Sequence, residues 1–412
     1  MLPTFSLAFL AALLLMVAVR LWLAQRQISH VIAHRATVPD KFADRIELGT
    51  HQKAADYTVA RTRFGRAGLA VEVAVLLALT LGGGLQLLHN FWTMRLDGLP
   101  YGVALIFSVI AISALVDLPL ALYHRFVIEE KFGFNRMTFK LFVSDLLKQA
   151  ALGLIIGTPA LLAVLWLMAK MGSLWWLYVW LFWCAFNLLI LFIYPTWIAP
   201  LFNKFAPLDD LELRTRVEAL LARCGFTTSG LFVMDGSTRS SHGNAYFTGF
   251  GRTKRIVFFD TLLGRLQAVE VEAVLAHELG HFKHRHVVKR IVMLFTLSLG
   301  FLAVLGQLID APWFYQGLGV DSRNTALGLL LFFLAGPVFT FLLTPLPSLL
   351  SRRDEFAADR YAARHASAES LVTALVKLYE DNAATLTPDP LHSLFYDSHP
   401  PAALRIARLQ TA

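Results

Sequence analysis

Long apolar segments dominate the pattern of hydrophobic and polar positions along the chain. A span must cross about 30 Å of hydrocarbon, and seven segments are long enough to do so. They lie at roughly 3–23, 67–88, 101–123, 150–170, 174–195, 291–309 and 325–349. Several contain Gly or Pro, which membrane helices tolerate where neighbours satisfy the freed backbone groups. The pattern predicts a polytopic α-helical membrane protein with seven spans.

Two polar stretches, 199–290 and 350–412, interrupt this pattern. In the first, apolar spacing predicts a helix over 208–224, strands at 231–234, 245–247 and 256–259, and a helix over 265–285. Together the stretches are long enough for one domain. We therefore expect a discontinuous α+β domain, with 199–290 as its first part and 350–412 as its second. A five-span region, 1–198, would precede it, and the last two spans, 291–349, would divide it.

Basic residues alternate between the connections. Loop 24–66 carries eight Lys or Arg and loop 124–149 carries five, whereas loops 89–100 and 310–324 carry one each. Cytoplasmic loops are enriched in Lys and Arg, so the N-terminus is expected outside, and the polar domain and C-terminus in the cytoplasm. The first apolar run has no basic residue before it, which favours a retained helix over a cleaved signal peptide.

Composition agrees with a membrane location. The residues Ala, Val, Ile, Leu, Met, Phe, Trp, Tyr and Cys make up 56% of the chain, and only 16% is charged, against about 25% in soluble domains. Two cysteines exclude a disulfide framework and a Cys-rich metal site. The net charge of +8 is explained by basic cytoplasmic loops, so membrane lipid is expected as a partner and nucleic acid is not.

The sequence His277-Glu278-Leu279-Gly280-His281 matches the H-E-x-x-H pattern of zinc peptidases. On a helix the two histidines lie on one face and can share a zinc ion. Glu278 follows the first ligand, where it can act as general base toward a water molecule. The alternative is a solvated helix that carries two histidines by chance.

A catalytic zinc usually has three protein ligands. The extended pattern with a third histidine requires Gly at 284 and His at 287, but the chain has His284 and Val287. The best candidate is Glu355, with Asp359 one helical turn later to hold a ligand histidine. These carboxylates could instead be solvated. His284 could be a decoy ligand, or could join His286, Lys283 and Arg285 in a basic patch.

Further motifs resemble the CAAX prenyl protease type 1 family of integral-membrane zinc metalloproteases. They occur in the family's order from about residue 120 to the C-terminus. They are 127–135 (VIEEKFGFN), 198–205 (IAPLFNKF), 240–247 (SSHGNAYF), 254–263 (KRIVFFDTLL), 277–281 (HELGH), 355–359 (EFAAD), and 399–401 (HPP) with Arg405. Residues 1–119 agree in number of spans more than in motif.

The resemblance implies seven spans around a water-filled chamber, with a zincin-like domain facing it from the cytoplasmic side. It implies one Zn²⁺ held by His277, His281 and Glu355, with Glu278 as the catalytic carboxylate and Asp359 behind the ligands.

It also implies that His399 and Arg405 support the substrate carbonyl and the site carboxylates; spacing alone would leave His399 a structural loop residue. An exposed edge strand at Asn244, Ala245, Tyr246 and Phe247 could pair with an extended substrate, unless it is an interior strand. Asp117, deep in the third span, would face either the wet chamber or a local partner. The run Glu129-Glu130-Lys131 is expected to be a solvated or packing segment near the membrane boundary rather than a catalytic one.

The expected function is an integral-membrane zinc metalloendopeptidase that acts on peptide or protein substrates, with processing at a prenylated C-terminal CAAX box. The nearest alternative is a quality-control protease such as the heat-shock protease HtpX. An alternative of another class is a non-catalytic metal-binding scaffold or transporter, which has no use for Glu278. The composition fits a bacterial inner membrane, or the endoplasmic reticulum if the chain is eukaryotic.

Overall fold

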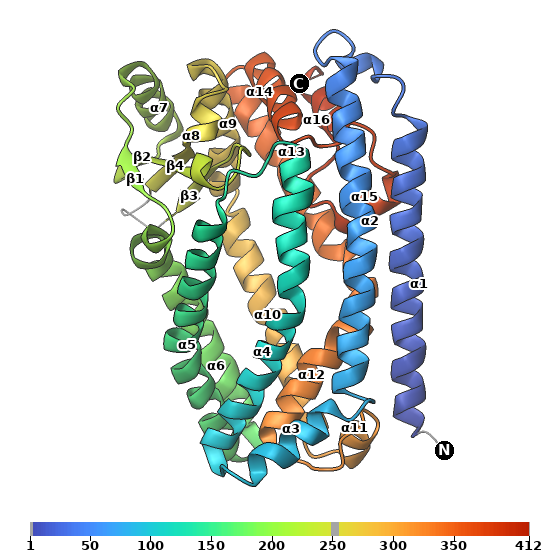
Figure 1. Ribbon diagram of the computed structural model, residues 1–412. Coiled ribbons are helices and arrows are strands. Elements are labelled where there is room, and N and C mark those ends of the chain that lie inside the picture. The colour runs from blue at the N-terminus through green and yellow to red at the C-terminus, as the bar shows by residue number, and fades with distance from the viewer. Residues whose placement is uncertain (1–2, 249–254, 412) are drawn as a thin grey trace.

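The computed structural model describes residues 3–248 and 255–411. Residues 249–254, which fall inside the first part of the expected polar domain and include Lys254 of one motif, lie outside the described residues. Long helices run along most of the molecule, and a small sheet with shorter helices lies at one end of it (Figure 1). The two termini lie at opposite ends, as an odd number of spans requires.

Six helices are long and apolar enough to cross a membrane, and a bent pair supplies a seventh span. The six are α1 (Thr4–Ala33), α4 (Gly98–Tyr123), α5 (Phe139–Lys170), α6 (Trp175–Ile193), α10 (His286–Leu308) and α12 (Thr325–Thr340). Short 3₁₀ or π turns extend α4, α6 and α12. The bent pair is α2 (Leu48–Leu79) and α3 (Gly84–Thr93), and the short α11 (Pro312–Gln316) lies between α10 and α12. The chain is therefore a multi-pass membrane protein.

The second expected span is broken, not continuous. Helices α2 and α3 meet at an angle of 49°. The break contains Gly83, which has a φ of +77°, a conformation that glycine adopts without steric cost. A Cβ added at Gly82 would lie 2.8 Å from the carbonyl oxygen of Ala78. Three consecutive glycines allow this tight turn. Because they are not polar, the turn leaves no polar gap in the sequence, and the apolar segment reads as one continuous span.

The long helices form a ring around an open interior. In the most apolar window of α1, α4, α5, α6 and α10, only 6–22% of residues are buried, against 50% in α12. Helices that pack into a solid bundle bury one face, so these helices must have accessible surface on both the lipid side and the inner side. They enclose the expected chamber.

The polar domain, defined here by elements β1 to α9 and α13 to α16, contains a four-stranded mixed sheet in the order β1-β2-β4-β3. The strands are β1 (Phe205–Pro207), β2 (Gly230–Met234), β3 (Ala245–Thr248) and β4 (Arg255–Phe259). Strands β2 and β4 are parallel, and the other two pairs are antiparallel. Three strands agree with the sequence. The first strand was not expected, because three residues that end in proline show no alternation of hydrophobic and polar positions.

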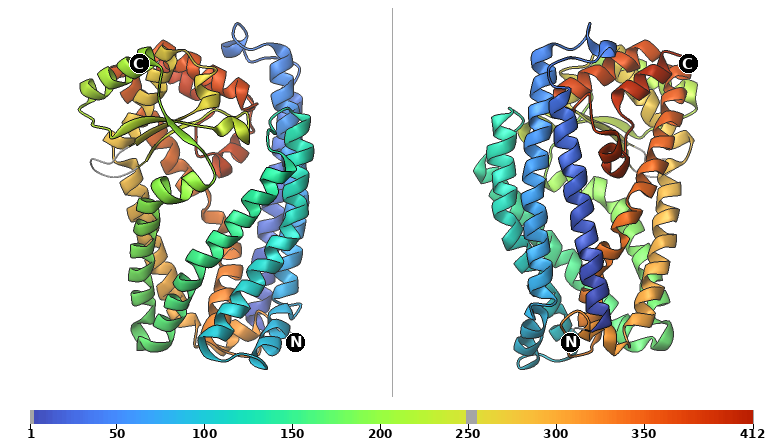
Figure 2. Two further views of the ribbon diagram at one scale, coloured as in Figure 1. Left: turned by 60° about the vertical axis from the view of Figure 1, so that its left-hand side comes forward. Right: turned by 90° about the vertical axis from the view of Figure 1, so that its right-hand side faces the viewer.

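Helices from both polar stretches share one hydrophobic core. It joins residues such as Val217, Phe258 and Leu279 from the first stretch to Leu371 and Ile406 from the second. The helices of the domain are α7 (Leu211–Cys224), α8 (Asp260–Leu263), α9 (Ala268–Lys283), α13 (Pro345–His365), α14 (Ala368–Asp381), α15 (Pro390–Tyr396) and α16 (Ala402–Leu409). Figure 2 shows them around the sheet, at one end of the long helices.

The seventh span ends earlier than its apolar pattern suggests. The 3₁₀ turn after α12 ends at Leu343, and α13 begins at Pro345. Proline fits the first turn of a helix but interrupts a helix interior. The apolar residues Leu346 and Leu349 therefore belong to α13, where both are exposed.

The segment around Glu129 is a buried connection between the spans and the polar domain. Glu129 is 4% exposed, and Tyr57 of α2 donates a hydrogen bond of 2.5 Å to its Oε1. On the other side, His242 Nε2 lies 3.7 Å from Glu129 Oε2, and His242 Nδ1 lies 2.9 Å from Asn382 Oδ1 at the end of α14. Of the two expected alternatives for this segment, solvated or packing, the structure shows packing at Glu129.

Candidate metal and peptidase site

The helix that carries the H-E-x-x-H motif has defined ends. The backbone N–H of Gln267 donates to Glu270 Oε2 at the start of α9, which satisfies one of the free amides of the first turn. At the other end, Arg285 has a left-handed backbone with a φ of +54°, and α10 begins at the next residue. His277 and His281 lie on consecutive turns inside this helix and therefore face the same way.

Three donor atoms converge between α9 and α13. His277 Nε2 lies 3.1 Å from His281 Nε2, and Glu355 places its carboxylate oxygens 3.5 Å and 3.2 Å from these two nitrogens. Donors bound tetrahedrally at about 2.0–2.1 Å from zinc lie roughly 3.3 Å apart. Glu355 Oε2 is buried and has no aligned hydrogen bond within the described residues. The residues present therefore fit a metal ion with two nitrogen ligands and one carboxylate.

A glycine lets the two helices approach closely. A Cβ added at Gly280 would lie 2.9 Å from Ala358 Cα and 3.0 Å from Tyr361 Cβ. Glycine is unfavourable inside a helix, so its presence here indicates that the backbones must come close. This contact positions Glu355 over the two histidines.

Asp359 and Arg405 lie behind His277. Asp359 Oδ1 is 2.8 Å from His277 Nδ1, which leaves Nε2 free to bind a metal. Arg405 of α16 donates from Nε and Nη2 to both oxygens of Asp359, at 2.9 Å and 2.6 Å. Since Arg405 is only 6% exposed, its contacts are with the site carboxylates.

His281 has a partner that the sequence did not reveal. Its Nδ1 lies 2.9 Å from Nδ1 of His286, and His286 Nε2 lies 3.3 Å from Asp354 Oδ1. His286 is 2% exposed, so its assignment to a basic surface patch is wrong. His284 is exposed and is not part of the metal cluster within the described residues. The left-handed Arg285 turns His286 inward, and that turn is not apparent from helical spacing.

The site is electrostatically suited to a cation. Burial would raise the pKa of the Glu355 carboxyl, but His277, His281 and His399 outweigh burial and hold that pKa below its usual range. Burial would lower the pKa of His277, but Asp359 and Glu355 raise that pKa to about 9. Two buried carboxylates therefore favour positive charge at the point where the three donors meet.

Glu278 directly follows His277 on α9, and His399 contacts the third residue of the donor triangle, Glu355. Glu278 is half-buried, and within the part of the chain that the structure describes its carboxylate forms no hydrogen bond or ion pair. His399 comes from the loop between α15 and α16. Its side chain is 61% exposed, and its Nδ1 lies 2.8 Å from Glu355 Oε2. Both side chains are available to a molecule that approaches the metal position.

The strand β3 lies at one edge of the sheet and pairs with β4. Asn244, directly before it, is exposed, and Ala245, Tyr246 and Phe247 are half-buried. The ring of Phe247 contacts the ring of Phe282 in the last turn of α9, with 6.0 Å between centroids. The strand edge therefore lies beside the helix that carries the metal cluster.

Two family models match the chain. Residues 27–204 match the model described as CAAX prenyl protease N-terminal, five membrane helices. Residues 207–412 match the model of peptidase family M48. The two matches meet between the fifth span and the polar domain.

Curated relatives are similar over most of their length. The CAAX prenyl protease 1 homolog of Arabidopsis thaliana is 35% identical, with 90% of this chain and 89% of that protein covered. CAAX prenyl protease 1 of Saccharomyces cerevisiae is 35% identical over 90% of this chain and 88% of that protein. The CAAX prenyl protease 1 homolog of Homo sapiens is 34% identical over 99% of this chain and 96% of that protein.

A solved structure extends the similarity to the whole fold. The crystal structure of S. mikatae Ste24p superposes with a TM-score of 0.90 at 31% identity and covers 99% of both chains. The sequence matches, the spans and the converging His-His-Glu donors are consistent with one another. The chain belongs to peptidase family M48 and, within it, to the CAAX prenyl protease type 1 metalloproteases.

Proposed function

We propose that this chain is a zinc endopeptidase that removes the last three residues of prenylated proteins that end in a CAAX sequence. The observation that carries the proposal is the triangle of His277, His281 and Glu355, with Glu278 directly after His277 on the same helix. The relatives named CAAX prenyl protease 1 support the substrate class. The CAAX cysteine is the prenylated residue.

The proposed chemistry assigns one task to each side chain. His277, His281 and Glu355 hold the zinc ion, which when bound supplies a Lewis acid that polarises the scissile carbonyl and makes water a better nucleophile. Glu278 accepts the proton of the attacking water and later delivers it to the leaving amine. Asp359, held by Arg405, keeps the His277 ring in its ligand orientation.

His399 is proposed to stabilise the charge that develops on the carbonyl oxygen. Its Nδ1 lies 2.8 Å from Glu355 Oε2, and when the ring carries both protons, Nε2–H is available to donate to the carbonyl oxygen. The edge of β3, from Asn244 to Phe247, is proposed to align the substrate, because an extended peptide can add a strand to an exposed sheet edge.

We also propose an orientation in the membrane. The basic loops support an N-terminus outside and a polar domain and C-terminus in the cytoplasm. The membrane is the bacterial inner membrane, or the endoplasmic reticulum in a eukaryote.

The test uses detergent-purified protein, two peptides and mass analysis of the products. One peptide is farnesylated at a C-terminal CAAX cysteine and the other is bare. We expect loss of the last three residues from the farnesylated peptide. Glu278→Gln should retain zinc, measured by metal content, but lower kcat by about 10²–10⁴-fold, the usual contribution of a general base.

The control is Glu212→Gln, an exposed position on α7, which should cleave like the unaltered protein. Cleavage of both peptides at scattered sites would instead favour a quality-control protease. Bound zinc without cleavage of any peptide would favour a metal-binding scaffold. Full activity of Glu278→Gln would contradict the assigned base.

A further inference from the structure

A cavity of about 630 Å³ adjoins the proposed metal site. It lies between α1, α2 and the segment that runs from the end of α14 to the start of α16. His399 lines the cavity and also contacts Glu355, so one end of the cavity opens at the ligands. Its volume falls in the range of about 300–1,000 Å³ that is typical of small-molecule pockets.

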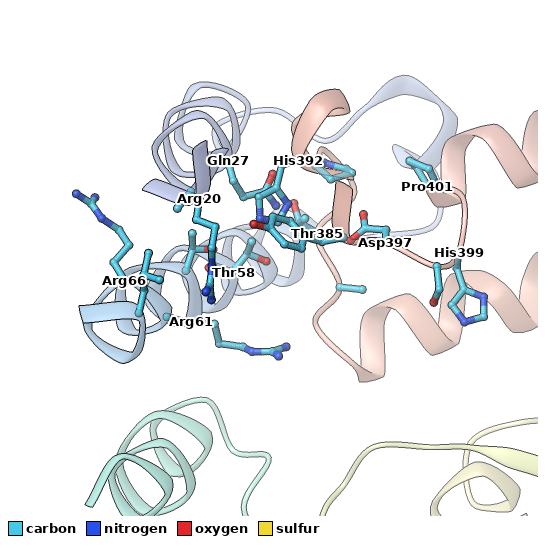
Figure 3. Close-up of a pocket in the computed structure, with 18 of the residues that line it drawn as sticks. Arg20, Gln27, Thr58, Arg61, Arg66, Thr385, His392, Asp397, His399 and Pro401 are labelled. Carbon is cyan, nitrogen blue, oxygen red and sulfur yellow. The ribbon is translucent and has the colours of Figure 1, made fainter. Parts of the chain in front are cut away.

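The cavity wall is basic. Three arginines line it (Arg20, Arg61 and Arg66), and Asp397 is the one carboxylate side chain among its lining residues. Arg20 forms an ion pair with Glu72 at 2.9 Å, so its charge is partly compensated. Figure 3 shows the arginines on the α1 and α2 side and His399 on the opposite side.

Arg61 is the arginine best placed to bind an anion. It forms no ion pair with a carboxylate among the described residues, and its guanidinium lies 5.3 Å from the centre of the Tyr57 ring. This cation–π contact orients the side chain without neutralising its charge. In Figure 3 Arg61 points toward the side of the cavity where His399 lies, whereas Arg66 points away.

We propose that this cavity binds the C-terminal carboxylate of the substrate, with Arg61 as its main partner. The inference rests on the proposed function, because removal of three residues places the carboxylate three residues beyond the scissile bond. Three extended residues span about 10 Å. When Arg61 binds the C-terminal carboxylate, the peptide bond three residues before it is placed at the metal site. Cleavage is thereby restricted to a fixed distance from the C-terminus.

The test compares farnesylated CAAX peptides that end in a free carboxylate with the same peptides ending in an amide. Hydrogen bonds to charged groups contribute more than neutral ones, so the unaltered protein should cleave the acid with a kcat/KM about 10- to 100-fold higher than the amide. Arg61→Gln should lower kcat/KM for the acid to the level of the amide. The cleavage that remains, equal for the two peptides, shows that the variant folds.

The matched control is Arg63→Gln, two residues away on α2 and outside the cavity wall. It removes the same charge and should retain the preference for the acid. Equal cleavage of acid and amide by the unaltered protein would overturn the carboxylate pocket while the proposed function stands. A loss in Arg61→Gln that is equal for both peptides would also overturn it, and would favour another anion such as a lipid phosphate. If neither peptide is cleaved, the proposed function fails and this inference fails with it.

Discussion

The two histidines of the H-E-x-x-H motif are oriented in different ways. Asp359 receives the Nδ1–H of His277 directly, whereas His281 meets a second imidazole. If His281 binds zinc through Nε2, its Nδ1 must carry the proton and donate it to His286. His286 then carries its own proton on Nε2 and donates to Asp354. A chain of hydrogen bonds therefore fixes the tautomer of His281, whose Nδ1 faces a second imidazole in place of a carboxylate.

His286→Leu should weaken zinc binding by about 10- to 100-fold, the usual loss when a partner of a metal ligand is removed. The measurement is competition between the protein and a chelator, read as retained metal. Asp354→Asn should have a smaller effect, because the amide oxygen can still accept from His286.

His284→Leu is the control for His286→Leu, since His284 lies two residues away but is exposed and outside the donor cluster. Its zinc affinity should not change. If both leucine variants retain zinc equally well, then His286 has no part in orienting His281.

At the scale of elements, the contact between α9 and α13 determines whether the site exists. The first helix supplies two proposed ligands, and the second supplies Glu355 and Asp359. The two helices lie on either side of the last two spans in sequence, so the site forms only when the polar domain closes around them. Gly280 occupies the closest point between the helices.

Gly280→Ala should separate α9 from α13 and lower both zinc affinity and the apparent melting temperature. The added Cβ would require shifts of backbone and Cβ atoms rather than of a flexible side-chain end, and overpacking of this kind costs about 1–3 kcal/mol. The matched control is Gly68→Ala in α2, where nothing lies within 4 Å of the added Cβ. Alanine favours a helix there, so stability should stay equal or rise. Unchanged zinc affinity in Gly280→Ala would contradict the role of the close α9–α13 contact in positioning the ligands.

The local pattern of hydrophobic and polar residues predicted the helices and strands better than it predicted the turns and contacts that connect them. Spans and three strands follow from hydrophobic runs, and the convergence of His277, His281 and Glu355 was anticipated from helical spacing and the family's motifs. The break at Gly83 and the short β1 leave no periodic signal. The contacts of Glu129 with Tyr57 and His242 join segments 72 and 113 positions apart, and nothing in the neighbourhood of either residue encodes them.

At the scale of the whole molecule, the ring of helices explains how a membrane span can carry the carboxylate of Asp117. Asp117 is exposed within α4 and forms no ion pair among the described residues, so the structure offers no support for local pairing. A carboxylate that faced hydrocarbon would be expensive. Leu115 is 68% exposed and lies about 200° away around the helix axis. One of these faces must therefore meet water and the other lipid.

Cysteine labelling tests this assignment and, with it, the water-filled interior. In a background with Cys184→Ser and Cys224→Ser, which removes both free cysteines, Asp117→Cys should react readily with a charged, membrane-impermeant thiol reagent. Leu115→Cys should react far more slowly, because lipid or detergent covers that face and a thiol reacts as the thiolate, which needs water. The measurement is the rate of mass increase for each variant. Comparable slow labelling at both positions would mean that α4 is covered on both sides, and a dry interior would leave peptide substrates no route through the ring to the metal site.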